Sequence, residues 1–192
     1  TALTIEPVIP GGREMRRILL TAIIFTLTLT VGLTQIPGNV TGGPPFGGPE
    51  DLNDAKGVWK ALTDARLVGD RSINAMPYEG SVHKTILITQ DSTIRVGGRS
   101  GMVIVKKMYQ GPGISVQKVI DDPTKNLKVV AVMFKREKGY DPANQDWFYA
   151  KLRSDGIPHK NKKGILLAGR VGKCIGCHKS ASGDDYVYSF SR

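Results

Sequence analysis

A charge-free apolar run near the N-terminus constrains this chain most, because it separates a short leading segment from everything that can fold as a domain. No Asp, Glu, Lys or Arg occurs from residue 18 to residue 36. As a helix, this run would rise about 1.5 Å per residue and just cross a hydrocarbon layer of roughly 30 Å. Arginines precede it, so the positive-inside rule predicts a cytoplasmic segment 1–17, a transmembrane anchor 18–36 and a periplasmic remainder at the inner membrane of a bacterium. A cleaved signal peptide is the alternative, and we expect the anchor to be retained.

The segment 37–50 is rich in Pro and Gly and has neither helical nor strand periodicity, which predicts a spacer before a single domain, residues 51–192. Residues 1–50 hold three basic and three acidic side chains, so the formal charge of +10 belongs entirely to the domain. Such a charge suits docking to an acidic redox partner or an anionic lipid surface, or it reflects scattered solvated lysines. With no recognition-helix pattern and no aromatic-basic interleaving, we expect no nucleic-acid partner.

The domain is predicted to be α+β and rich in strands. Apolar residues recur near a 3.6-residue period over 51–67, which predicts one amphipathic helix. Period-two alternation and β-branched residues predict strands at 82–89, 102–109 and 127–134, with turns at 95–101, 110–113 and 121–126. The glycine-rich stretch 97–101 lacks the Lys-Ser/Thr ending of a phosphate loop, so we expect a hairpin turn there. The expected architecture is a mostly antiparallel sheet with a few packed helices.

Both cysteines lie in one motif close to the C-terminus, Cys174-Ile175-Gly176-Cys177-His178. In a C-x-x-C-H run, two thiols can add to the vinyl groups of a haem while the following His coordinates the iron. The motif predicts one covalent haem c per chain, with thioether links at Cys174 and Cys177 and iron ligation by His178. A thioredoxin-like site would need a βαβ setting, and a zinc site would need more ligands than two Cys and three His readily supply. A simple disulfide is a further alternative outside the cytoplasm.

The position of the motif is unusual for a small electron-transfer cytochrome, which carries it in an N-terminal helix and recruits a downstream Met. Only fourteen residues follow His178, and none is Met. Candidates for a sixth iron ligand are His83, His159, Met102, Met108 and Met133, although a single such side chain is more often a packing or surface residue. Aromatic residues that could line a haem pocket, or form ordinary core, are Trp147, Phe148, Tyr149 and Tyr186.

Short blocks of sequence accompany the motif: Gly101-Met102-Val103-Ile104-Val105-Lys106, Gly139-Tyr140-Asp141-Pro142, Asp146-Trp147-Phe148-Tyr149, Ala168-Gly169-Arg170-Val171 and Asp185-Tyr186-Val187. Their combined spacing resembles the cytochrome P-460 family and its relatives, the cytochromes c′-beta, over residues 81–190. This resemblance implies an antiparallel sheet with packed helices, often in a homodimer, and a five-coordinate haem iron. Members of the family oxidise hydroxylamine, bind nitric oxide or have no assigned activity.

In the catalytic members a lysine is cross-linked to the haem, and the resemblance assigns this position to Lys106. The residues alone leave the matter open, because alternation places Lys106 and Lys107 on opposite apolar faces, and either could reach solvent at a strand end. The resemblance also implies a distal carboxylate that moves protons from bound substrate. The strand 129–133, where we would expect this acid, contains none, and Glu137 and Asp122 are the remaining candidates.

Two functions of different classes follow. The first is a membrane-anchored periplasmic mono-haem cytochrome that transfers electrons or serves as an accessory subunit of a membrane redox complex. The anchor, the basic domain and the missing distal acid favour it, whereas the absence of an evident sixth ligand does not. The second is a haem enzyme or gas binder that acts on hydroxylamine or nitric oxide at an open iron face, and the family resemblance and Lys106 favour it.

Overall fold

The computed structural model describes residues 45–80, 85–182 and 185–188, and all of them belong to one compact unit. The predicted cytoplasmic segment 1–17, the anchor 18–36 and most of the spacer lie outside these residues. Within the described ranges, no helix combines the length and the apolar character needed to span a membrane.

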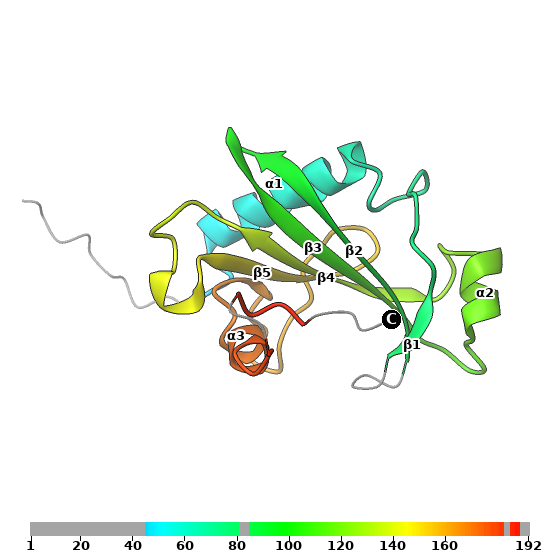
Figure 1. Ribbon diagram of the computed structural model, residues 1–192. Helices are drawn as coiled ribbons and strands as arrows, with labels where there is room; N and C mark the ends of the chain where they lie inside the picture. The colour runs from blue at the N-terminus through cyan, green and yellow to red at the C-terminus, as the bar shows by residue number, and fades with distance from the viewer. Residues whose placement is uncertain (1–44, 81–84, 183–184, 189–192) are drawn as a thin grey trace, which may run out of the picture. The chain divides into compact units, whose positions relative to one another are not determined.

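One antiparallel sheet of six strands organises the domain, and its strands follow one another in chain order (Figure 1). The strands are β1 (Tyr78–Gly80), β2 (Thr85–Val96), β3 (Arg99–Tyr109), β4 (Leu127–Lys135), β5 (Trp147–Leu152) and β6 (Ala168–Gly169). This meander confirms the expected α+β architecture built on an antiparallel sheet. The predicted strands at 102–109 and 127–134 correspond to β3 and β4. The strands β5 and β6 carry no alternation strong enough to have been predicted.

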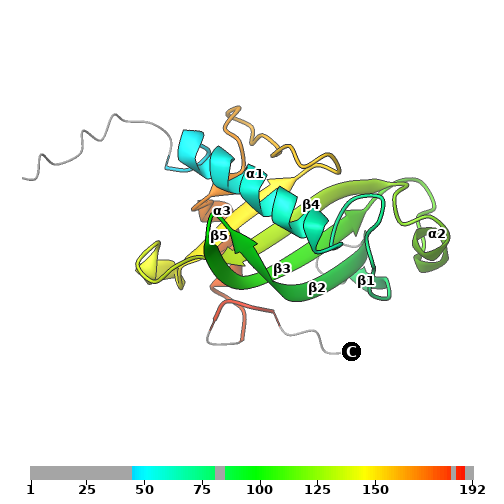
Figure 2. The same ribbon diagram turned by 90° about the horizontal axis from the view of Figure 1, so that it is seen from above.

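The helices lie on different parts of this sheet. They are α1 (Pro49–Asp64), α2 (Val116–Asp121) and α3 (Gly172–His178), with a short 3-10 turn at Pro142–Asn144. Figures 1 and 2 show α1 and α3 on opposite sides of the sheet and α2 at one end. Because strand side chains alternate, Val103 and Val105 of β3 pack in the core under α1, whereas Ile104 packs with residues of α3.

Local sequence explains where α1 begins and ends. Pro49 occupies the first helical position, and the Asp51 carboxylate accepts a hydrogen bond from the Gly48 amide at 3.3 Å. At the other end, Arg66 has a left-handed φ of 56°, and the Leu67 amide donates to the Leu62 carbonyl at 2.8 Å. This is a Schellman-type ending, so the helix stops before the predicted end of 51–67 although its apolar pattern continues.

The hairpin between β2 and β3 is tighter than the predicted turn at 95–101. Gly97 and Gly98, with φ values of 54° and 82°, form the connection, and pairing resumes at once between Val96 and Arg99. Two consecutive residues at positive φ match the twist of a two-residue hairpin, and glycine adopts that conformation without steric cost. As a result, β2 runs seven residues beyond the predicted strand end at Thr89, through a polar stretch that the alternation pattern did not reveal.

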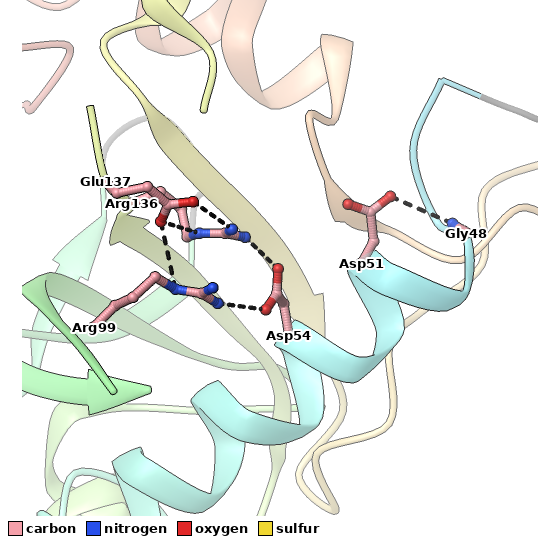
Figure 3. A network of polar contacts seen from close by, with 6 residues as sticks. All are labelled: Gly48, Asp51, Asp54, Arg99, Arg136 and Glu137. Carbon is pink, nitrogen blue, oxygen red and sulfur yellow. Dashed lines mark hydrogen bonds and ion pairs between the residues drawn. The ribbon is translucent and has the colours of Figure 1, made fainter. Parts of the chain in front are cut away.

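A network of ion pairs links α1 to the start of β3 and to the residues that directly follow β4 (Figure 3). Asp54 of α1 accepts hydrogen bonds from Arg99 at 2.9 Å and from the buried Arg136. Glu137 forms two bonds of 2.9 Å with the same Arg136 guanidinium, and this pairing lowers the pKa of Glu137 to about 2. Because Arg136 is buried between the carboxylates of Asp54 and Glu137, loss of either one would leave its charge less well compensated.

Two polar side chains of the sheet hold the loop that leads to β1. The Gln90 amide donates to the Ile73 carbonyl at 2.9 Å, and the Lys107 ammonium donates to the side-chain oxygen of Asn74. Lys107 is only 2% exposed and faces away from α3, on the same side as its pairing partner Ile88. Burial lowers the pKa of Lys107 to about 8 from its ordinary value of 10.5. A protonated lysine at this position therefore opposes folding.

We predict that Lys107→Met changes how stability depends on pH. Below pH 8 the wild-type protein bears the full cost of burying the charge, and this cost is relieved as pH rises from about 8 towards 10.5, where the unfolded chain still holds the proton. The free energy of unfolding of wild type relative to Lys107→Met should thus rise over this window by about 3 kcal/mol. Denaturant titrations at several pH values, with the exposed Lys118→Met as a matched control, measure it. Parallel curves for wild type and Lys107→Met would contradict the prediction.

Candidate haem-binding site

The helix α3 carries all three residues of the C-x-x-C-H motif. It begins directly after β6, where Gly169 has a φ of 100° and a Cβ atom would lie 2.3 Å from a carboxylate oxygen of Asp51. Glycine is therefore required where the chain turns from the sheet into α3. Cys174 and Cys177 lie three residues apart on one side of this helix, and both are free thiols. Cys174 is half-buried, with its pKa raised to about 11 by burial, and Cys177 is exposed.

One ring nitrogen of His178 is fixed by the chain that follows the motif. Its Nδ1 lies 2.9 Å from the carbonyl oxygen of Tyr186. A carbonyl oxygen only accepts, so Nδ1 carries the proton and Nε2 holds the lone pair that a metal ligand needs. The rings of Tyr149 and Tyr188 flank the imidazole, each with its centroid 5.5 Å away. Burial, together with the positive charge of Lys106, lowers the pKa of His178 and favours the neutral imidazole.

Residues 185–188 form a strap against the sheet, and contacts with β4 and β5 hold it. The indole nitrogen of Trp147 donates to the Asp185 carbonyl oxygen at 2.9 Å. The Asp185 carboxylate pairs with Lys135, whose ammonium also lies 4.6 Å from the centroid of the Trp147 ring. Asp185 directly precedes Tyr186, so these contacts position the carbonyl group that orients His178.

Lys106 lies on the sheet face that carries α3. Its charge interacts with Cys177 and with His178, and burial lowers its pKa. In the sheet register, Lys106 stands between Thr89 of β2 and Ala131 of β4. The Thr89 hydroxyl is 2.8 Å from that of Tyr78 in β1, which adds a polar group beside the lysine. The structure therefore brings Lys106 to the motif and places Lys107 on the other face.

Two apolar clusters flank this lysine on the same face. One gathers against α3 and the strap and includes Ile104, Met133, Trp147, Tyr149 and Val171. The other lies further along the strands and includes Leu87, Met108 and Val129, with Ala131 packed against it. Lys106 and Ala131 occupy the strip between them, because side chains of β3 and β4 alternate along the strand. A flat apolar cofactor with polar edges is suited to such a surface.

The residues present fit a haem. The Tyr149 hydroxyl is buried and has no hydrogen-bond partner among the described residues, although it lies in the cluster around α3. Burial raises the pKa of this Tyr149 hydroxyl, so it stays protonated and can donate a hydrogen bond to a bound ligand. The described part of the chain holds no group of three or more His, Cys, Asp or Glu side chains that could bind a metal ion.

The candidate sixth ligands and pocket aromatics differ in whether they lie on the sheet face of α3, under α1 or at the surface. Trp147, Tyr149, Tyr186 and Met133 lie in the cluster around α3. Met108 lies in the second cluster on the same face, whereas Phe148 packs in the core under α1. His159 contacts the Lys128 carbonyl oxygen at 3.1 Å and is solvent-accessible, and Met102 is 38% exposed. Residue 83 lies outside the described ranges.

Neither of the two remaining acids lies at the motif. Glu137 is held by Arg136 and Arg99 beside α1, and the Asp122 carboxylate caps the loop after α2 by accepting from Thr124. Asp91 of β2, which pairs with Ile104 and so shares the face of α3, was overlooked in the sequence. The extension of strand alternation beyond Thr89 would have revealed it.

We predict that Trp147→Phe removes the hydrogen bond to the Asp185 carbonyl oxygen and so loosens the strap, while the phenyl ring keeps most of the buried apolar volume. The Tyr186 carbonyl then binds the His178 Nδ1 proton less firmly, and the imidazole becomes a weaker electron donor. In the haem-loaded protein, the iron–histidine stretching frequency should fall and the midpoint potential should rise, because the oxidised iron loses stabilisation. Resonance Raman spectroscopy and redox titration measure both changes.

The matched control is Phe148→Leu, an aromatic replacement at the adjacent position on the opposite face. It should leave the iron–histidine frequency of the loaded protein unchanged even where it lowers stability. If Trp147→Phe leaves both the frequency and the potential at their wild-type values, the strap does not orient the ligand.

Comparison with known proteins agrees with this geometry. The Cytochrome P460 family model matches residues 80–189, which is more than half of the chain. The match begins in β1, spans the sheet and includes the C-x-x-C-H helix and the strap. No curated protein and no solved structure shows significant similarity to the chain. The chain therefore belongs to the cytochrome P460 family, whose members bind haem.

Proposed function

We propose that this chain is a membrane-anchored periplasmic mono-haem c-type cytochrome that transfers electrons or serves as an accessory haem subunit of a membrane redox complex. The observation that carries the proposal is the arrangement on α3: two free thiols at motif spacing, followed by a His whose Nδ1 is engaged by Tyr186. When bound, haem supplies an iron centre that can change oxidation state by one electron.

In this proposal the haem is held covalently. Cys174 and Cys177 would hold it through thioether links, and His178 would ligate the iron through Nε2. The thiols lie three residues apart on one side of a helix of seven residues, Gly172–His178, as the C-x-x-C-H attachment of haem requires. The buried Tyr149 hydroxyl and the ammonium of Lys106 supply hydrogen-bond donors around it. The apolar clusters on either side exclude water, which tunes the redox potential.

Electron transfer is favoured over multi-step oxidation by the side chains opposite the motif. On the face of α3, the described strands β3, β4 and β5 present no carboxylate, and the residue directly opposite Lys106 is Ala131. Asp91 of β2 lies on this face, but it is exposed and pairs with Ile104 rather than with Lys106. Oxidation of a protonated substrate needs a base within hydrogen-bond reach. Met108 and Met133 lie on the same face, so thioether sulfurs are available near the site.

The partner assignment follows from the sequence. The anchor 18–36 would hold the domain at the periplasmic surface, and the charge of +10 in residues 51–192 suits an acidic redox protein or the anionic membrane surface. A homodimer, as the family resemblance implies, is the alternative to contact with another subunit. No role with nucleic acid is proposed.

A second candidate is a haem enzyme or gas binder that acts on hydroxylamine or nitric oxide. The position of Lys106 favours it, because the structure places this lysine close enough to Cys177 and His178 for their charges to interact. In this candidate Lys106 would be joined to the haem, which would bind hydroxylamine or nitric oxide.

Extraction of the protein from membranes and measurement of its intact mass test the first proposal. We expect a retained segment 1–36 and the added mass of one haem, because thioether links survive denaturation. Cys174→Ala and Cys177→Ala together should abolish the added mass. In a peptide map, the haem should stay with residues 174–178, and the peptide that contains Lys106 should be separate. Loss of residues 1–36 would show a cleaved signal peptide, and haem joined to Lys106 would favour the second candidate.

Hydroxylamine turnover separates the two functions. We predict background turnover for wild type and a gain of about 100-fold or more for Ala131→Glu, since general-base catalysis contributes rate factors of this order. Ala131→Gln, which has the same shape without a base, is the matched control and should stay at background. Fast turnover by wild type, or a ferrous spectrum that shifts with carbon monoxide, would contradict electron transfer and support the open-face candidate.

A further inference from the structure

A cavity of about 370 Å³ lies at the end of the sheet where α2 packs. Its walls come from the loop before β1, from β2 and from α2, and its apolar members include Met76, Pro77, Ile88, Val119 and Ile120. The one polar side chain in the lining is Asn74. Ile88 faces away from α3, so this cavity and the candidate haem site are on opposite faces of the sheet. Its volume is at the lower end of the range for small-molecule sites.

The wall of the cavity touches a buried cation. Asn74 accepts a hydrogen bond from Lys107, which is 2% exposed and stands beside Ile88 in the strand register. Among the residues that the structure describes, no carboxylate pairs with this ammonium. A buried ammonium that is matched only by one neutral amide oxygen is under-compensated, because hydrogen bonds to a counter-charge are about twice as strong.

The mouth of the cavity exposes apolar side chains. Met76 is 73% exposed and Ile120 is 45% exposed, while Ile88 and Val119 at the inner end are each 1% exposed. Pro123, which also lines the cavity, is held by the Tyr109 hydroxyl, which donates to its carbonyl oxygen at 3.0 Å. The cavity thus has exposed apolar side chains at its entrance and buried apolar side chains inside. The ammonium of Lys107 lies next to the lining residue Asn74.

We propose that this cavity binds a small organic anion, a carboxylate with an apolar tail. The carboxylate accepts from Lys107 beside or in place of Asn74, and the tail covers Met76 and Ile120 while it packs on Ile88 and Val119. A neutral ligand would leave the ammonium uncompensated, and a cation would be repelled by it. This site is independent of the haem chemistry, because the sheet separates the two.

Binding of octanoate to the full-length, haem-loaded protein tests the proposal. Isothermal titration calorimetry should show saturable binding to one site, and 1-octanol, which has the same tail without the charge, should bind at least about tenfold more weakly. Lys107→Met should weaken octanoate binding by about tenfold or more and leave 1-octanol binding unchanged. The variant replaces a buried charge with an apolar side chain of similar shape, so it is expected to fold.

Two further variants distinguish this site from general attraction to a basic protein. Ala75→Trp changes an exposed residue in the cavity lining and should block both ligands. Lys118→Met removes an exposed charge from the neighbouring helix α2 and should leave octanoate binding unchanged. The haem absorption spectrum, recorded during the titration, should not move. Equal octanoate binding by wild type and Lys107→Met, or a fall with Lys118→Met as large as with Lys107→Met, would overturn the proposal.

Discussion

Burial of the central strands on both faces is the constraint on which the other features depend. Val103, Val105 and Phe134 fill the core under α1, while Ile104 and Met133 of the same strands support α3. Strand alternation alone sends these two sets to opposite sides, and the α1 ion-pair network fixes the helix over its own face. The two proposals, a haem on one face and an organic anion on the other, are compatible because they use side chains on opposite faces of the same strands.

The elements with strong local patterns could be predicted from the sequence. The helix α1 shows a 3.6-residue apolar period, the strands β3 and β4 show two-residue alternation, and residues 174–178 show the C-x-x-C-H spacing. Each of these signals lies within a short stretch of sequence. Their ends could not be predicted as well, because a left-handed Arg66 and a two-glycine turn set them. The short strands β5 and β6 depend on pairing with β4 and carry little signal of their own.

The motif residues of the candidate site could be predicted, but their supports could not. Nothing near Asp185 indicates that Lys135 and Trp147 hold it, since those partners lie 50 and 38 residues earlier. Likewise strand alternation alone leaves Lys106 and Lys107 equivalent, although the family resemblance favours Lys106, and the register with Thr89 and Ala131 places Lys106 on the face of α3. The opposite lysine, with no role in the haem proposal, then becomes the basis of the second site.

The strap has a consequence for how this domain matures. His178 and Tyr186 are near neighbours in the chain, but the contacts that hold Tyr186 come from two strands that must already be paired with each other. The imidazole therefore reaches the orientation that Tyr186 fixes only after the sheet has assembled, and any local opening of β4 and β5 releases it. With the iron bound at His178 as proposed, its spectrum would report whether β4 and β5 are intact, although the ligand itself lies on α3.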